Sequence, residues 1–212
     1  MRISVATALS WTPPPALAQG GRGVRWTRLP VVAAAQIINA VQTIASRKIH
    51  PLDGAVVSVT QIHGGATWIV IPDSVVLRGT TRSFDPAVRD TLDPAIRRVA
   101  EGACASLGAK MMMRYERRYP PTVNSPAETE IASEIASALV GDSNVRRDLL
   151  PSMGAEDFAC FLEAKPGAYI WIGNGASAEQ PMLHNPRYDF NDEILPLGAS
   201  YWARLAESVL AK

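Results

Sequence analysis

The chain has 212 residues, which is enough to bury a hydrophobic core in one or two domains. Apolar residues make up 47% and charged residues 19%, and this composition excludes an intrinsically disordered chain. The 21 Lys and Arg against 20 Asp and Glu leave a net charge of +1, so no overall field attracts nucleic acid. The longest apolar run, Val31 to Ala35, is far shorter than a bilayer span of roughly 20 residues. We therefore expect a folded, soluble protein without nucleic-acid or membrane partners.

The first 29 residues show no sustained helical or strand period and contain three consecutive prolines, Pro13 to Pro15. We expect residues 1–29 to form an irregular lead-in. The apolar stretch Ile3 to Leu9 follows a basic residue and precedes small residues, which imitates a secretory signal. The stretch is short and runs into the prolines, so the expected location is cytoplasmic, with export as the alternative.

Residues 30–119 alternate between helical and strand patterns. Apolar residues spaced three and four apart predict a helix from Pro30 to about Arg47. Asp85-Pro86 opens a second long amphipathic segment that ends near Gly108. Strands are predicted at Gly54 to Ile62, Thr67 to Ile71, Val75 to Arg82 and Met111 to Tyr119. These elements predict a two-layer α+β unit.

Pro120-Pro121 marks the expected boundary of this unit. Beyond it we expect helices around Ala127 to Val140, Glu156 to Glu163 and Leu197 to Leu210, and a strand at Tyr169 to Ile172. These roughly 90 residues contain few strands for their helices to cover. We therefore expect them to be part of a larger domain and to leave apolar surface exposed.

Few side chains can carry metal or nucleophilic chemistry. The two cysteines, Cys104 and Cys160, lack the spacing of a zinc site, and we expect both to be buried. The histidines are His50, His63 and His184, and we expect the first two to lie in turns or at the surface. No GxGxxG, Walker-type, HExxH or GxSxG motif is present, which leaves dinucleotide, P-loop, zincin and α/β-hydrolase functions without their local signature.

Two segments of the C-terminal half remain as candidates for a site. In Met153-Gly154-Ala155-Glu156-Asp157-Phe158, two acids follow a glycine at the start of a short helix. The alternative interpretation is a capped helix start, since acids there are favoured by the helix dipole. His184 lies on a loop rich in Pro and Asn, a favourable place for a functional residue. Its alternative is a histidine that only hydrogen-bonds the backbone.

The segments MGAEDFACFL, PGAYIWIGNG and LHNPRYDFND, with VVSVTQIHGG and RGTTRSFD before them, resemble the M20 metallopeptidase and amidohydrolase family. The resemblance runs from about Leu29 to the C-terminus and is greatest to the hippurate hydrolase and N-acyl-amino-acid amidohydrolase group. It implies an α+β ferredoxin-like lid, or dimerisation, domain inserted in a two-metal catalytic domain. Residues 30–119 would be the lid, and residues 120–212 an incomplete α/β catalytic portion.

The resemblance also implies roles for four residues. His184 is similar to the family's C-terminal metal ligand, and Glu156 resembles an acid that lines the same site. Gly154 would allow a close backbone turn beside it. Arg82 resembles a lid residue that binds the substrate carboxylate, a task suited to the bidentate geometry of a guanidinium.

The sequence also departs from the family pattern. Ile69 stands where the family would have an Asn, and an aliphatic side chain donates no hydrogen bond. Gly20 and Arg25 stand where a lid Gly-Gly-His segment would lie. The stretches that would supply the remaining metal ligands and the general base have no counterpart in the sequence.

The resemblance implies a metal-dependent amidohydrolase of N-acyl amino acids or similar small amides, which would use Zn, Mn or Co. We expect the chain to be truncated, inactive alone and a homodimer through its lid. The alternative is a non-catalytic dimerisation module, or a fragment that pairs with a full-length relative.

Overall fold

The computed structural model describes residues 2–3, 7–11, 29–175 and 181–210, and the chain divides into two compact units. The first, which we call the sheet unit, comprises Arg2–Thr122 and Pro151–Cys160. The second, the helical unit, comprises Val123–Leu150 and the residues from Phe161 onward.

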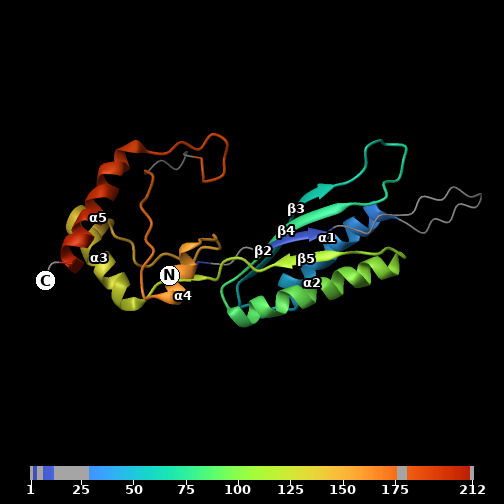
Figure 1. The fold of residues 1–212 in the computed structure, drawn as a ribbon, viewed down its shortest axis with the longest axis horizontal. Coiled ribbons are helices and arrows are strands. Elements are labelled where there is room, and N and C mark those ends of the chain that lie inside the picture. The colour runs from blue at the N-terminus through green and yellow to red at the C-terminus, as the bar shows by residue number, and fades with distance from the viewer. Residues whose placement is uncertain (1, 4–6, 12–28, 176–180, 211–212) are drawn as a thin grey trace, which may run out of the picture. The chain divides into compact units, whose positions relative to one another are not determined.

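A four-stranded antiparallel sheet forms the base of the sheet unit (Figure 1). Its strands lie in the order β3-β4-β2-β5, so β3 and β5 are the edges. Two short strands, β1 and β6, make a separate pair. The bounds are β1 Arg2–Ile3, β2 Thr7–Trp11, β3 Ala55–His63, β4 Val76–Ser83, β5 Met113–Glu116 and β6 Thr122–Val123.

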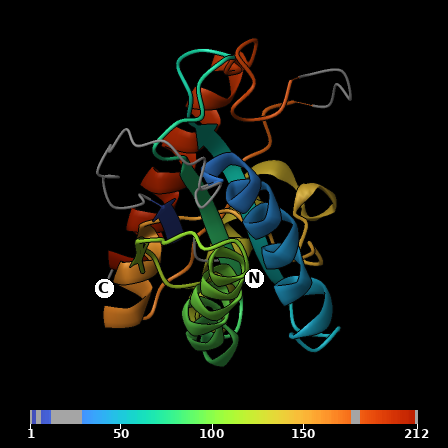
Figure 2. The same ribbon diagram turned by 90° about the vertical axis from the view of Figure 1, so that its right-hand side faces the viewer.

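Two long helices, α1 (Pro30–Arg47) and α2 (Pro86–Ser106), lie side by side on one face of this sheet (Figure 2). Pro30 occupies the first turn of α1, where its missing N–H costs no hydrogen bond. Asp85 caps α2, because its carboxylate accepts a hydrogen bond from the Ala87 N–H. Both predicted helices are confirmed.

The core of the sheet unit lies between the helices and the sheet. The inward residues of α1 recur every three or four positions, as the sequence pattern predicted. In β4, Leu77 and Thr81 are buried, whereas Arg78 is exposed on the other face. Fully buried side chains from three elements meet here, namely Val41, Ile44, Leu77, Leu92 and Ile96. One face of the sheet is thus apolar and covered, and we call the other the open face.

Strand β2 was not expected. Thr7–Trp11 falls in the segment predicted to be irregular, and for these residues the prediction is wrong. Leu9 pairs with Gly79 of β4 on one side and with Tyr115 of β5 on the other. The alternation of apolar and polar residues over only five positions is too short to predict a strand. The residues with which β2 pairs are also far away in the sequence. Pro13 to Pro15 and the glycine-rich run that follows lie outside the described residues.

The strand predicted at Thr67 to Ile71 is also wrong. These residues form the exposed loop that joins β3 to β4. Because β3 and β4 pair directly with each other, the sheet offers no position for another strand between them. A short apolar run cannot be assigned by periodicity alone. The predicted strands on either side of the loop, and the edge strand β5, are confirmed.

The helical unit is held together by the packing of two helices, α3 (Pro126–Val140) and α5 (Leu195–Leu210). Its core consists of Ala132 and Ile135 from α3 and Tyr201 from α5. The short helices are η1 Asp142–Asn144 and η2 Asp192–Ile194, and α4 Phe158–Ala164 begins in the sheet unit and ends in this one. All three helices predicted beyond Pro121 are present, although α4 begins two residues later than expected.

No strand forms at Tyr169 to Ile172, so that prediction is wrong. The side-chain amide of Asn124 takes the place of a neighbouring strand at Tyr169. Its Nδ2 donates to the Tyr169 carbonyl over 2.9 Å, and its Oδ1 accepts from the Tyr169 N–H over 2.9 Å. The segment is held at this point by a side chain and not by a ladder of backbone hydrogen bonds.

The expectation that apolar surface remains exposed beyond Pro121 is confirmed. Large apolar side chains on α4, α5 and the connecting segments are exposed, among them Phe161, Trp171, Leu183, Phe190 and Trp202. Where such exposed apolar side chains are contiguous, they mark surfaces that contact another polypeptide or a ligand.

The two cysteines differ in environment. Cys104 lies in the core, and its burial raises the pKa of the thiol. Cys160 is exposed, so the expectation that it is buried is wrong. None of the helices among the described residues combines the length and the apolar composition needed to cross a membrane.

We predict a large loss of stability on truncating a core leucine and almost none at an exposed one. Leu92 of α2 is 0% exposed, whereas Leu52 is 88% exposed. Leu92→Ala should lower the free energy of unfolding by about 2–5 kcal/mol, because it removes buried apolar contacts and leaves a cavity. Leu52→Ala should change it by less than about 0.5 kcal/mol. Chemical denaturation followed by circular dichroism measures both; similar losses would contradict the assigned core.

Candidate functional site

Arg82 stands on the open face of the sheet, at the end of β4. Its neighbours Thr81 and Ser83 are buried toward the helices, so the alternation of the strand directs Arg82 to the opposite face. The guanidinium Nη1 donates a hydrogen bond to the backbone carbonyl of Met153. Arg82 thereby contacts the loop that carries the two other site residues predicted in the sheet unit.

The loop around Met153 approaches the sheet closely because Gly54 has no side chain. A Cβ at Gly54 would lie 2.8 Å from Cε of Met153 and 3.0 Å from the Phe84 ring. Gly154 follows Met153, and its N–H donates to the Ser152 hydroxyl over 3.1 Å. Packing against Gly54 thus fixes the position of this loop beside Arg82.

Glu156 lies two residues before α4. One of its carboxylate oxygens accepts from the Phe158 N–H over 3.4 Å, and its backbone carbonyl accepts from the Ala159 N–H over 3.4 Å. This is the helix-start role that the sequence left open as the alternative. The side chain is half-buried.

His184 occupies a tight turn in the helical unit. The Asn185 N–H donates to the Met182 carbonyl over 3.1 Å, which closes the turn around Leu183 and His184. His184 has a φ of 71°, in the left-handed region that residues other than glycine seldom adopt. The imidazole is exposed. The turn presents this side chain outward at a conformational cost, and such strained backbone is common at functional sites.

Asn174 positions the loops that follow, and sequence reasoning missed it. Its Nδ2 donates to the Asp189 carbonyl over 3.0 Å, and its Oδ1 accepts from the Asn191 N–H over 2.8 Å. One side chain therefore holds the residues on the C-terminal side of the His184 turn. Its place between two glycines in Gly173-Asn174-Gly175 was the available signal.

The described residues do not by themselves form a metal centre. Arg82, Gly154 and Glu156 belong to the sheet unit and His184 to the helical unit. Within the described ranges, no three His, Cys, Asp or Glu side chains lie together in a way that could hold a metal ion. His50 and His63 are exposed, as expected, and each contacts a near neighbour, the Leu52 N–H and the Gln61 amide respectively.

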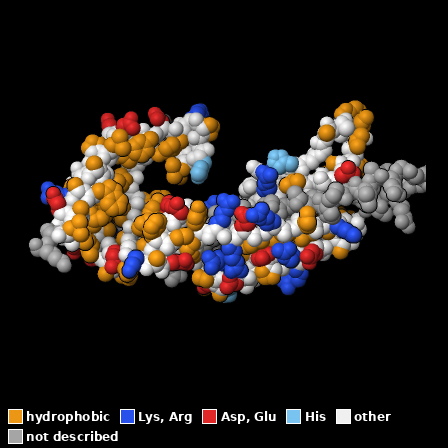
Figure 3. Space-filling model, in the orientation of Figure 1, with side chains coloured by type: hydrophobic (Ala, Val, Ile, Leu, Met, Phe, Trp, Pro, Cys, Tyr) orange, Lys and Arg blue, Asp and Glu red, His pale blue; other side chains and the backbone are white. Residues whose placement is uncertain are grey.

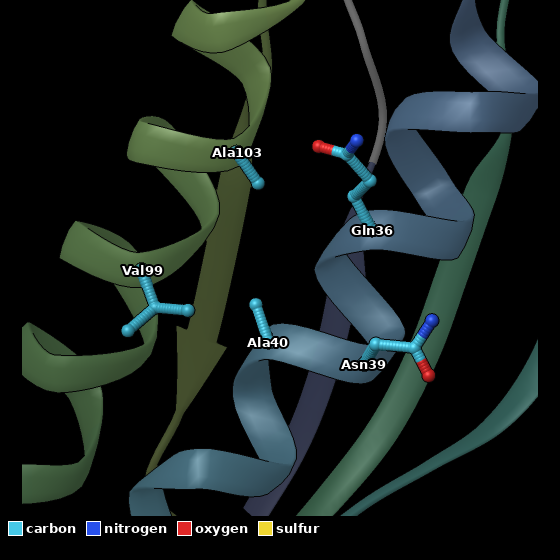
Figure 4. Close-up of a pocket in the computed structure, with 5 residues that line it drawn as sticks. All are labelled: Gln36, Asn39, Ala40, Val99 and Ala103. Atoms are coloured by element: carbon cyan, nitrogen blue, oxygen red, sulfur yellow. The ribbon is translucent and has the colours of Figure 1, made fainter.

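A shallow pocket of about 480 Å³ lies between α1 and α2 (Figure 4). Its lining residues are Gln36, Asn39 and Ala40 from α1, and Val99 and Ala103 from α2. None of them is charged or nucleophilic, and the helices lie on the face of the sheet opposite Arg82. This pocket is therefore separate from the predicted site.

Comparison with known proteins places the chain in a family. Residues 15–208 match the model of peptidase family M20/M25/M40. The N-acetylcysteine deacetylase of Bacillus subtilis is 37% identical over 181 residues, which are 85% of this chain and 46% of the deacetylase. The hippurate hydrolase of Campylobacter jejuni is 33% identical over 177 residues, 84% of this chain and 45% of the hydrolase. The chain spans about half the length of these curated relatives.

A solved structure agrees with the sequence relatives. The crystal structure of the Bacillus subtilis YXEP protein, described as a dinuclear metal binding peptidase from the M20 family, superimposes with a TM-score of 0.69 at 29% identity. The match covers 99% of this chain and 51% of that one. The resemblance inferred from the motifs is thus confirmed by sequence and by fold, and the chain belongs to peptidase family M20/M25/M40.

Proposed function

We propose that this chain is the lid domain and the C-terminal catalytic portion of a metal-dependent amidohydrolase that acts on N-acyl amino acids or similar amides. The family match over residues 15–208 carries this proposal. Relatives named for N-acetylcysteine and for hippurate support the substrate class, because both compounds are N-acyl amino acids.

The lid comprises residues 30–119, and the catalytic portion residues 120–212. The order β2-α1-β3-β4-α2-β5 supports a ferredoxin-like lid, since it repeats the β-α-β-β-α-β pattern of that motif. The same order adds β2 to the lid, although Thr7–Trp11 precedes residue 30.

Arg82 is the residue that binds the substrate carboxylate. Its Nη1 is held by the Met153 carbonyl, which orients the guanidinium plane and leaves its other N–H groups to pair with a carboxylate. Gly154 allows the backbone beside it to approach the ligand, and Glu156 lines the site from the same loop.

The metal is zinc, manganese or cobalt, and His184 is a ligand. Hydrolysis of this kind requires several His, Cys or carboxylate ligands around the metal. The described residues gather no group of three. The proposed reaction therefore requires metal ligands in addition to those that the described residues bring together.

We predict that the purified chain alone does not hydrolyse hippurate with added Zn²⁺, Mn²⁺ or Co²⁺. The physical reason is the missing ligand set. Release of glycine measures turnover, and metal analysis after gel filtration measures retained metal. A hippurate hydrolase assayed in parallel controls for the reagents. Metal-dependent turnover that disappears in His184→Ala would show that this chain assembles a complete centre.

The carboxylate role of Arg82 is tested by binding and not by turnover. We predict that Arg82→Gln weakens binding of N-acetylglycine about tenfold, because hydrogen bonds to a charged group are among the stronger ones. Isothermal titration calorimetry measures the affinity. Arg98→Gln is the matched control, since Arg98 is exposed on α2, on the other side of the sheet. Equal losses in the two variants would refute a specific role for Arg82.

A second candidate function is non-catalytic self-association through the lid. β3 is an edge strand whose last residues are exposed, and the loop that follows presents Trp68, which is 96% exposed, together with Ile69, Val70 and Ile71. Figure 3 shows hydrophobic side chains at the end of this loop. An open edge beside an apolar loop favours pairing with a second copy, and Ile69 suits an apolar contact.

We predict that the chain is a homodimer in which α1, the β3 edge and this loop meet the partner. Trp68→Ser should raise the dimer dissociation constant about tenfold, because it removes a large apolar side chain from the interface. Sedimentation equilibrium measures the constant. Leu52→Ser, another exposed apolar residue in the same unit, is the control and should leave it unchanged. A monomer at all concentrations would exclude this function.

A further inference from the structure

The open face of the sheet carries more positive charge than the carboxylate role of Arg82 requires. Arg78 of β4 and Arg114 of β5 both stand on this face, as does Arg82. Figure 3 shows basic side chains gathered over the sheet beside a histidine. We propose that Arg78 and Arg114 form a second anion-binding position, which takes a carboxylate at the end of the ligand remote from Arg82. This inference rests on the proposed function and names a substrate class, linear amides with two carboxylates.

The register of the sheet places the two arginines at one level. Arg78 lies opposite Ser10 in the pairing of β4 with β2, and Arg114 lies opposite Ser10 in the pairing of β2 with β5. Directly opposed residues in antiparallel strands project from the same face. Two strand spacings separate their backbones by about 10 Å, so two long arginine side chains can reach one anion between them.

The charge at this level is incompletely neutralised. Arg78 donates through Nη1 to the neutral Gln61 side chain over 3.3 Å, and no carboxylate within the described residues pairs with it. Arg114 pairs with Glu116, which Arg118 also contacts over 3.5 Å. Arg114 and Arg118 therefore share one carboxylate while Arg78 faces a neutral amide, and an incoming anion would meet a net positive surface.

The distance along β4 sets the length of the ligand. Arg78 and Arg82 are four residues apart on one strand, which corresponds to about 13 Å between their backbones. An extended tripeptide spans about 10 Å, so a tripeptide with a short dicarboxylic acyl group reaches from one arginine to the other. The net charge of +1 argues against a long polyanion such as nucleic acid.

The test compares two probes that differ in the distal carboxylate. Succinyl-triglycine carries a carboxylate at both ends, whereas acetyl-triglycine carries only the C-terminal one. Isothermal titration calorimetry of the full chain at low salt gives the two affinities. We expect succinyl-triglycine to bind about threefold to fivefold more tightly, the size of an exposed ion pair, and the preference to shrink as NaCl is added.

Three variants show which residues cause the preference for succinyl-triglycine over acetyl-triglycine. Arg78→Gln should reduce the affinity ratio to about one without changing the binding of acetyl-triglycine. Glu116→Gln should raise the ratio, because it removes the carboxylate that competes for Arg114. Arg98→Gln on α2 is the control and should leave the ratio unchanged. Thermal unfolding of each variant confirms that these surface changes leave the fold intact.

The outcomes separate this inference from the proposed function. Equal affinities for the two probes, or a ratio that Arg78→Gln does not change, would overturn the second anion position and leave the role of Arg82 standing. Binding of succinyl-triglycine that depends on Arg78 but not on Arg82 would support the second position and refute the proposed carboxylate role. Binding of neither probe would overturn both.

Discussion

Strand β2 is the element on which the sheet unit depends. It is hydrogen-bonded to β4 on one side and to β5 on the other, and it is the element that joins them into one sheet. Without it, the facing edges of β4 and β5 would each lose a row of partners, and every buried backbone group left unpaired costs about 1–3 kcal/mol. Thr7–Trp11 lies before the range matched by the family model. The strand that completes the sheet therefore precedes the residues matched by the family model.

The completed sheet separates two chemical surfaces. The helices α1 and α2 cover one face with aliphatic side chains, and this burial supplies most of the stability of the unit. The other face is free to carry charge because it does not contribute to that core. Arg78, Arg82 and Arg114 stand there, and Arg82 meets the Met153 loop. Because side chains alternate along a strand, the apolar face and the charged face belong to the same sheet.

The helical unit is organised differently, by side chains that replace a sheet. Asn124 pairs with the backbone of Tyr169, and Asn174 bridges Asp189 and Asn191. These side-chain amides hydrogen-bond to the backbone of loops that are not paired in a sheet. The His184 turn is closed by the backbone hydrogen bond from Asn185 to Met182. Large apolar residues on α4 and α5 stay exposed. Among the residues that the structure describes, no three potential metal ligands lie together in this unit.

The sequence by itself was sufficient to predict the family and both long helices. It also identified the motifs that contain the candidate site residues Arg82, Gly154, Glu156 and His184. Helical periods and caps are local, because residues within one or two turns decide them, as Pro30 and Asp85 show. Only the tertiary structure decided that Thr7–Trp11 is an inner strand, that Thr67 to Ile71 is a loop, and that Arg78 and Arg114 share one level of the open face. Strand β2 pairs with residues more than 60 positions away in the sequence. No local sequence pattern indicates which strand edge still lacks a partner.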